Sequence, residues 1–315
     1  MNTALRLSVY GAAVLLLAAG AYVAGTSAGT STGHLRPPPA HAAPREDTPE
    51  VRPAGLASTA DGYTLEAATP TLPSGAATEI AFRITGADGA PVTTFDVAHE
   101  KRMHLILLRR DTAGFQHLHP EMSGDGTWRA PVTLDGGGTY RVFADFTPTG
   151  GEPATLGVDL SAPGPFEPVS PQPSRVARVD GGYEVQLDGD LRPGETGPLT
   201  LTVTRDGRPV TDLQPYLGAS GHLVALRTGD LAYLHVHPED APGAGPGITF
   251  HTEVPSAGTY RLFLDFRHDD VVRTAEFTVP TTGNAAPADG PAPAGPAARP
   301  GPAGDEHSHD EGGHR

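Results

Sequence analysis

The feature that most constrains this chain is an internal repeat. The segment MHLILLRRDTAGFQHLHPE begins at Met103, and the similar segment GHLVALRTGDLAYLHVHPE begins at Gly221. Three pairs of histidines are each 118 residues apart, and GTYRVFADF recurs as GTYRLFLDF at an offset of 120. A regular offset across several motifs indicates a tandem duplication. The chain must therefore build one fold twice, each time from about one hundred residues.

Both copies read as short strands separated by turn signals. In the first copy, strand-like runs such as 78–85, 103–109 and 139–146 are bounded by Gly, Pro and Asp, and no segment keeps a helical period. Seven such runs in each copy predict an antiparallel Greek-key sandwich. Tyr140 and Tyr260 each open a late strand after a corner rich in small residues, which is typical of a tyrosine corner. We expect an all-β chain of two tandem β-sandwiches.

The composition changes along the chain divide it into segments. The run from Val9 to Ala24 is apolar and uncharged, as in a signal peptide or an uncleaved membrane anchor. We favour the anchor because a long spacer follows it, and either alternative places both sandwiches outside the cytoplasm, secreted or attached to the cell membrane by a single pass. The expected segments are a signal or anchor helix (1–24), a disordered stalk (25–60), sandwich 1 (61–161), a Pro-rich linker (162–180), sandwich 2 (181–280) and a disordered His-containing tail (281–315).

Composition and motifs exclude several function classes. The chain has no cysteine, so it has no disulfides, thiolate metal sites or cysteine nucleophiles. Its formal net charge of -15 argues against nucleic acid as a partner. Gly-rich phosphate loops and the HExxH motif are absent from the sequence. We therefore expect that the protein is not an enzyme.

The repeated histidines lie in a predicted hairpin. In the first copy the turn centres on RRDTAG, which places His104 opposite His119 and Ile106 opposite His117. Side chains alternate along a strand, so His117 and His119 share a face, and opposed residues lie about 4.5–5.5 Å apart at Cβ. The second copy repeats the pattern, with His222 opposite His237 and Val224 opposite His235. Each hairpin is thus predicted to gather three imidazoles.

Three neutral imidazoles around one point suit copper or zinc, because both metals bind nitrogen ligands well. We expect copper, since copper(II) has the higher intrinsic affinity, and zinc is the alternative. Each sandwich is expected to hold one ion through its own triad: His104, His117 and His119, or His222, His235 and His237. The competing interpretation is a structural one, because the same strand face carries apolar residues such as Ile106 and Phe115.

Further side chains are weaker candidates. Some are carboxylates that could be a fourth ligand or a hydrogen-bond partner of a ligand: Glu121 and Glu239 after each HxHP, and below them Asp145 and Asp265. The others are thioethers for copper(I) and imidazoles of the tail: Met103, Met122, His307, His309 and His314.

The run KRMHLILLRRDTAGFQHLHPEM with GTYRVFADF, and its second copy, resemble a family of uncharacterised bacterial secreted or membrane-anchored proteins. Their Ig-like domains are similar to YtkA-like and CopC-like copper-resistance modules. The resemblance covers residues 61–280 and implies Ig-like or cupredoxin-like sandwiches with a role in extracytoplasmic copper handling. The chain departs from blue-copper proteins because it lacks their cysteine ligand.

We therefore expect a metal-binding protein that buffers, senses or delivers copper, with a membrane metal transporter as a possible partner. Two alternatives remain open. One is an Ig-like protein-interaction module without metal. The other is an accessory subunit of a membrane complex.

Overall fold

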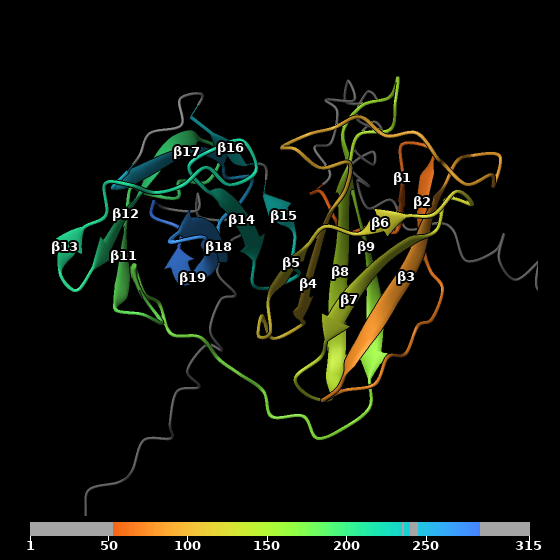
Figure 1. Cartoon of the computed structure of the whole chain (residues 1–315), viewed down its shortest axis with the longest axis horizontal. Coiled ribbons are helices and arrows are strands. Elements are labelled where there is room, and N and C mark those ends of the chain that lie inside the picture. Colours follow the sequence, from red (N-terminus) through yellow and green to blue (C-terminus); the bar gives the residue numbers. More distant parts are fainter. Residues whose placement is uncertain (1–52, 235, 240–244, 284–315) are drawn as a thin grey trace, which may run out of the picture. The chain divides into compact units, whose positions relative to one another are not determined.

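The computed structural model describes residues 53–234, 236–239 and 245–283 (Figure 1). These residues form nineteen β-strands in four sheets and contain no helix, which confirms the predicted all-β class. No helix among them is long and apolar enough to span a membrane. The expected signal or anchor helix at 1–24 and the tail from residue 284 lie outside the described residues.

Sandwich 1 consists of two antiparallel sheets. The first sheet runs in the order β1 (Thr59–Ala60), β2 (Tyr63–Ala67), β3 (Ala77–Thr85), β7 (Trp128–Thr133) and β6 (Glu121–Met122). The second runs β5 (Gln116–Leu118), β4 (His104–Arg109), β8 (Gly138–Phe146) and β9 (Ala154–Ala162). β7 alternates buried and exposed residues, as a strand with one solvated face does. β4 is buried at every position, so both of its faces are covered.

Sandwich 2 repeats this arrangement. Its first sheet runs β10 (Val176–Val179), β11 (Tyr183–Asp188), β12 (Thr196–Arg205), β17 (Gly247–Glu253) and β16 (Val236–Pro238), and β13 (Arg208–Pro209) also pairs with β12. Its second sheet runs β15 (Tyr233–Leu234), β14 (His222–Arg227), β18 (Thr259–His268) and β19 (Val271–Pro280). The order of corresponding strands is the same in both copies, as expected of a duplication.

A tyrosine closes the same corner in both copies. The hydroxyl of Tyr140 donates to the carbonyl oxygen of Gly136 at 3.0 Å, and that of Tyr260 donates to the carbonyl oxygen of Ser256 at 2.8 Å. Both bonds reach back to the backbone just upstream, as in the tyrosine corner of Greek-key sandwiches. The corner fixes the start of β8 and β18, the strands that run beside β4 and β14.

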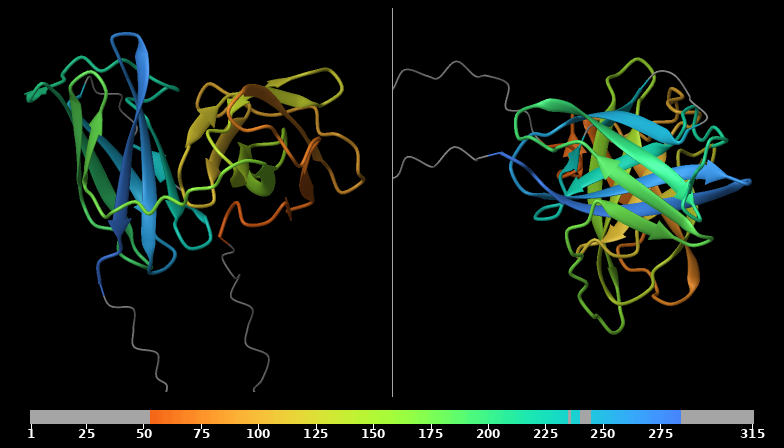
Figure 2. Two further views of the ribbon diagram at one scale, coloured as in Figure 1. Left: turned by 90° about the horizontal axis from the view of Figure 1, so that it is seen from below. Right: turned by 90° about the vertical axis from the view of Figure 1, so that its left-hand side faces the viewer.

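Each sandwich has its own apolar core, and a third buried cluster contains residues of both sandwiches. The strands that carry these residues can be followed from two further directions in Figure 2. We call this third cluster the interface core. It consists of Ile106, Leu108, Phe143, Val224, Leu226, Leu231 and Phe263, with Phe115 and Tyr233 packed against it. The rings of Phe115 and Phe263 stack with centroids 4.0 Å apart. The interface core explains why β4 has no exposed face.

The edges of the sandwiches differ from the predicted segments. The expected stalk at 25–60 includes residues that belong to the fold, because Gly55 donates its N–H to the carbonyl oxygen of Thr155 at 3.0 Å. The expected linker at 162–180 ends in β10 and is tied to sandwich 1, where Asp111 accepts the N–H of Val169 at 2.8 Å. Backbone and carboxylate bonds of this kind tie the residues around Gly55 and Val169 to sandwich 1.

Candidate metal centre

In sandwich 1, the strand register brings the predicted histidines together. β4 begins at His104, which lies opposite Asp145 in β8. β5 pairs with β4 so that Ile106 lies opposite His117, which is the predicted register. β5 ends one residue before His119, and the chain then passes to β6 in the facing sheet. Pro120 lies between β5 and β6, where its missing N–H does not remove a hydrogen bond between paired strands.

In sandwich 2, the chain also changes sheets, and one predicted pairing is wrong. β14 begins at His222, which lies opposite Asp265 in β18. β15 pairs with β14, but β16 pairs with β17, where His237 lies opposite His251 rather than His222. The crossing between β15 and β16 is the reason. His235 and the side chain of His237 lie outside the described residues, so the second triad is described only at His222.

The first triad and His222 meet in one cluster between the sandwiches. Ligand atoms of His104, His117 and His222 all lie within 4.8 Å of one another. The His222 ring stacks on His104 with centroids 5.3 Å apart, and its centroid is 4.6 Å from that of His117. The His119 ring lies 4.8 Å from His117 and 5.2 Å from His104. Among the described histidines, those of sandwich 1 therefore converge with His222 of sandwich 2, whereas the prediction placed the two triads in separate hairpins.

Two outer hydrogen bonds fix the tautomers of His104 and His117. The Nε2 of His104 lies 3.1 Å from the carbonyl oxygen of Ala98, which can only accept, so Nε2 carries the proton. The Nδ1 of His117 lies 2.8 Å from Oδ2 of Asp265. Asp265 also accepts the hydroxyl of Thr274 at 2.6 Å, as an ionised carboxylate does. The proton of neutral His117 therefore sits on Nδ1.

These hydrogen bonds leave one nitrogen of each ring directed toward the other. The Nδ1 of His104 and the Nε2 of His117 are 3.1 Å apart, and when both rings are neutral each of these nitrogens offers a lone pair. Two nitrogens bound to one copper or zinc ion at about 2.0–2.1 Å are separated by about 2.9–3.4 Å. The observed separation of 3.1 Å lies within that range. The geometry of this pair therefore fits a metal ion.

The other two histidines also present unpaired nitrogens. The Nε2 of His119 and the Nδ1 of His222 are buried and have no hydrogen-bond partner among the described residues. Burying such a group without a partner is costly. Burial, with smaller contributions from neighbouring histidines, lowers the pKa of His104 to about 4 and that of His119 to about 3. The pKa of His222 is lowered well below its usual range for the same reasons. All three imidazoles are therefore neutral at pH 7, the form in which an imidazole can bind a metal.

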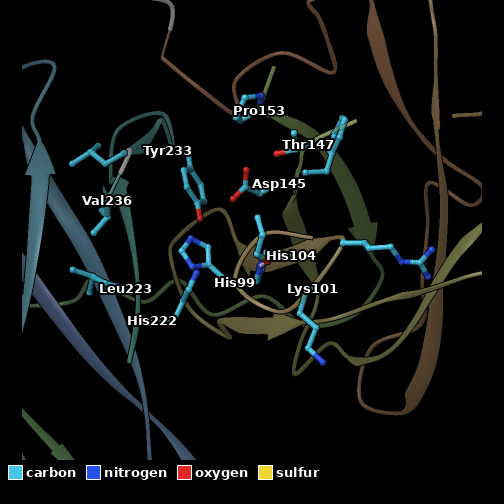
Figure 3. Close-up of a pocket in the computed structure, with 14 residues that line it drawn as sticks. His99, Lys101, His104, Asp145, Thr147, Pro153, His222, Leu223, Tyr233 and Val236 are labelled. Atoms are coloured by element: carbon cyan, nitrogen blue, oxygen red, sulfur yellow. Dashed lines mark hydrogen bonds between the residues drawn. The ribbon is translucent and has the colours of Figure 1, made fainter. Parts of the chain in front are cut away.

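A fifth histidine, which the sequence analysis did not assign, lies at the edge of this cluster. The exposed His99 ring has its centroid 5.7 Å from His222 and 6.1 Å from His104. Figure 3 shows these three histidines beside a cavity of about 190 Å³, which Tyr233 and Lys101 also line. Nothing in the repeat pattern could have revealed His99, because the second copy has Leu217 at the same offset.

Most of the weaker candidates lie away from the cluster. Met103 points to the opposite face of β4 from His104 and is buried in the core of sandwich 1, and Met122 packs against the same core. Glu121 and Glu239 are exposed and do not belong to the converging group of His104, His117 and His222. Two candidate carboxylates do reach the cluster: Asp265 lies 2.8 Å from His117, and Asp145 lies opposite His104 and lines the same cavity. The tail histidines His307, His309 and His314 lie outside the described residues.

Comparison with known proteins gives a family match. A family model described as "Domain of unknown function (DUF8832)" matches residues 58–163 and again residues 177–283. The match is not to the YtkA-like or CopC-like modules expected from the resemblance. No curated protein matches the chain.

Solved structures give only distant similarities. The Escherichia coli adhesin FdeC is 16% identical, with a TM-score of 0.23, over 71% of this chain and 65% of that one. Escherichia coli alpha-2-macroglobulin activated by porcine elastase is 14% identical, with a TM-score of 0.23, over 70% of this chain and 20% of that one. A marsupial T cell receptor is 11% identical, with a TM-score of 0.22, over 70% of this chain and 100% of that one.

Proposed function

The chain belongs to the DUF8832 family through both of its sandwiches, and we propose that the two copies together bind a single divalent copper ion. The observation that carries this proposal is the convergence of His104, His117 and His222, whose ligand atoms lie within 4.8 Å of one another, with His104 Nδ1 and His117 Nε2 3.1 Å apart. The unpaired nitrogens of His119 and His222 support it, because a cation would satisfy them as well.

The donor set favours copper(II) over other common divalent ions. It consists of imidazole nitrogens without a thiolate, and copper(II) has the highest intrinsic affinity of the first-row ions for such ligands. Zinc is the competing ion, since it accepts a tetrahedral set of four imidazoles. Asp265 would not bind the ion, but its bond to His117 Nδ1 would hold that ring in the ligating tautomer.

The role we propose is buffering, sensing or delivery of copper outside the cytoplasm, without catalysis. The location is inferred from the apolar run Val9–Ala24. Delivery would require a recipient, and a membrane metal transporter is the partner we propose. The cavity beside His104 and His222 supports exchange of the ion with the surroundings, because it lies against two of the proposed ligands.

Titration with copper(II) at pH 7.4 tests the proposal. The full chain would carry alanine at His307, His309 and His314 so that the tail does not compete. We expect one tightly bound ion per chain, lost in a His104→Ala variant. A matched His251→Ala variant, changed at an exposed histidine of β17, should bind as tightly as the parent chain. Undetectable binding, or two equal ions per chain, would contradict the proposal.

A protein-interaction module is the second candidate function. The observation that favours it is the exposure of Val97, whose surface is 66% accessible on the loop before β4. Under this alternative, replacement of the clustered histidines by glutamine would leave the biological activity of the chain unchanged.

A further inference from the structure

If the buried histidine cluster binds copper as proposed, a function on which this inference rests, the ion must reach it from the surface. His99 stands on a tight turn in which Ala98 and Lys101 exchange two backbone hydrogen bonds of 2.9 and 3.0 Å. Both central residues, His99 and Glu100, have positive φ angles of 49° and 63°. Such turns favour asparagine and glycine, so the sequence accepts backbone strain here.

This turn is tied to the cluster in two ways. The carbonyl oxygen of Ala98 accepts the Nε2 proton of His104, which leaves His104 Nδ1 free for a metal. The next residue, His99, presents its ring to both His104 and His222 from the exposed side. One strained turn therefore both prepares a buried ligand and holds an exposed imidazole at the edge of the site.

The second copy contains the same turn without the histidine. Tyr216 and Ala219 form the corresponding backbone pair, and the central residues Leu217 and Gly218 have φ angles of 55° and 79°. The two turns approach each other, since a Cβ atom at Gly218 would lie 3.9 Å from the Glu100 side chain. The same turn conformation therefore accepts leucine at position 217. In the turn that lines the cavity of about 190 Å³, the corresponding residue is His99.

We infer that the cavity of about 190 Å³ is the entry route of the ion and that His99 is its first protein ligand, ahead of His222 and His104. Lys101 and Arg102 line the same cavity and repel a cation, Asp145 attracts one, and His99 is the exposed imidazole beside them. His99 would take the ion from solvent and pass it to the buried nitrogens by ligand exchange. It would return the ion along the same path on release.

The test compares rates with affinity in the full chain with the tail histidines replaced by alanine. Copper(II) is mixed rapidly with the protein, and binding is followed by quenching of Trp128, the single tryptophan. Release is followed after addition of EDTA. In a His99→Leu variant, which copies the residue of the second turn, we expect uptake and release to slow several-fold by the same factor. The equilibrium affinity should stay nearly constant.

Two further variants keep the result interpretable. His99→Asn keeps a residue suited to positive φ and should slow exchange as His99→Leu does. Glu100→Gly relaxes the turn but keeps the imidazole, so its rates should match the parent chain. Unchanged rates in His99→Leu would overturn the entry role. A lower affinity with faster release would also overturn it, because His99 would then be a resident ligand. Failure of the parent chain to bind copper would instead remove the proposed function.

Discussion

His104 and His222 hold the same position in the two copies, at the start of β4 and β14, and each lies opposite an aspartate of the next strand. Their surroundings differ. His104 is anchored through Nε2 to Ala98, whereas the Nδ1 of His222 has no partner among the described residues. Sandwich 2 also supplies Asp265 to a histidine of sandwich 1. Equivalent residues of a duplicated fold have thus become different parts of one shared site.

The largest expected effect concerns the contact that makes the site shared. Phe263→Ala removes a fully buried ring from the interface core, which should lower the free energy of unfolding by about 3–5 kcal/mol. Urea unfolding of the parent should follow one transition by both circular dichroism and Trp128 fluorescence. In the variant the two signals should separate, since Trp128 reports on sandwich 1 alone. Val271→Ala, at a 49% exposed side chain, should change little. Separate transitions in the parent would contradict the coupling.

The next effect asks whether the two copies share one ion. His222→Ala in sandwich 2 should weaken copper binding by more than about 100-fold. Removing a ligand should lower the affinity more than removing the hydrogen-bond partner of a ligand, which costs about 10–100-fold. His104→Ala in sandwich 1 should weaken it to a similar degree. Isothermal titration calorimetry of both variants gives the comparison. If one tight ion remains in either variant, the copies act separately.

A smaller effect tests the bond that crosses from one copy to the other. Asp265→Asn should lower copper affinity by about 10–100-fold, because the amide holds the tautomer of His117 less firmly than the carboxylate does. Asp212→Asn is the matched control. Asp212 accepts a hydrogen bond from His268 at 3.0 Å, and neither residue belongs to the histidine cluster. That control should bind copper as the parent does. Equal loss in both variants would indicate a general effect on stability.

The smallest expected effect, for each half unit of pH, is the change in stability of the metal-free protein with pH. In the folded chain the pKa values of His104 and His119 are about 4 and about 3, below the ordinary value of 6.5. At pH values between these limits the unfolded chain therefore binds more protons than the folded chain. Stability should therefore be complete above pH 6.5 and fall as the pH drops toward 4 and 3. Each half pH unit should cost under about 1 kcal/mol per histidine. Urea midpoints from pH 7.5 to 4 measure it, and a His104→Gln variant should show a shallower fall.

Much of the fold follows from the sequence because its signals are local. Alternating apolar residues and turn residues predicted the strands, and the turn between the strands set Ile106 opposite His117. The tyrosine corners could be recognised for the same reason. The changes of sheet between β5 and β6 and between β15 and β16 could not, because a strand that crosses between sheets keeps its alternating pattern.

The convergence of His222 with the histidines of sandwich 1 could not be predicted from the sequence pattern for a different reason. It depends on which outer faces of the two sandwiches pack together, and that is a long-range property. One signal was present: HLILLR in β4 is apolar at both alternating positions, as in a strand buried on both faces. His99 gave no signal, because only its placement beside His104 and His222 distinguishes it.

The interface core carries a consequence for proteins with one copy of this domain. Ile106, Leu108 and Phe115 of sandwich 1 correspond by repeat offset to Val224, Leu226 and Tyr233 of sandwich 2, so the contact is self-complementary. A surface of this kind is what a twofold-symmetric homodimer requires. A relative with a single domain would pair with a second molecule through the same face, and its histidine site would form only upon dimerisation.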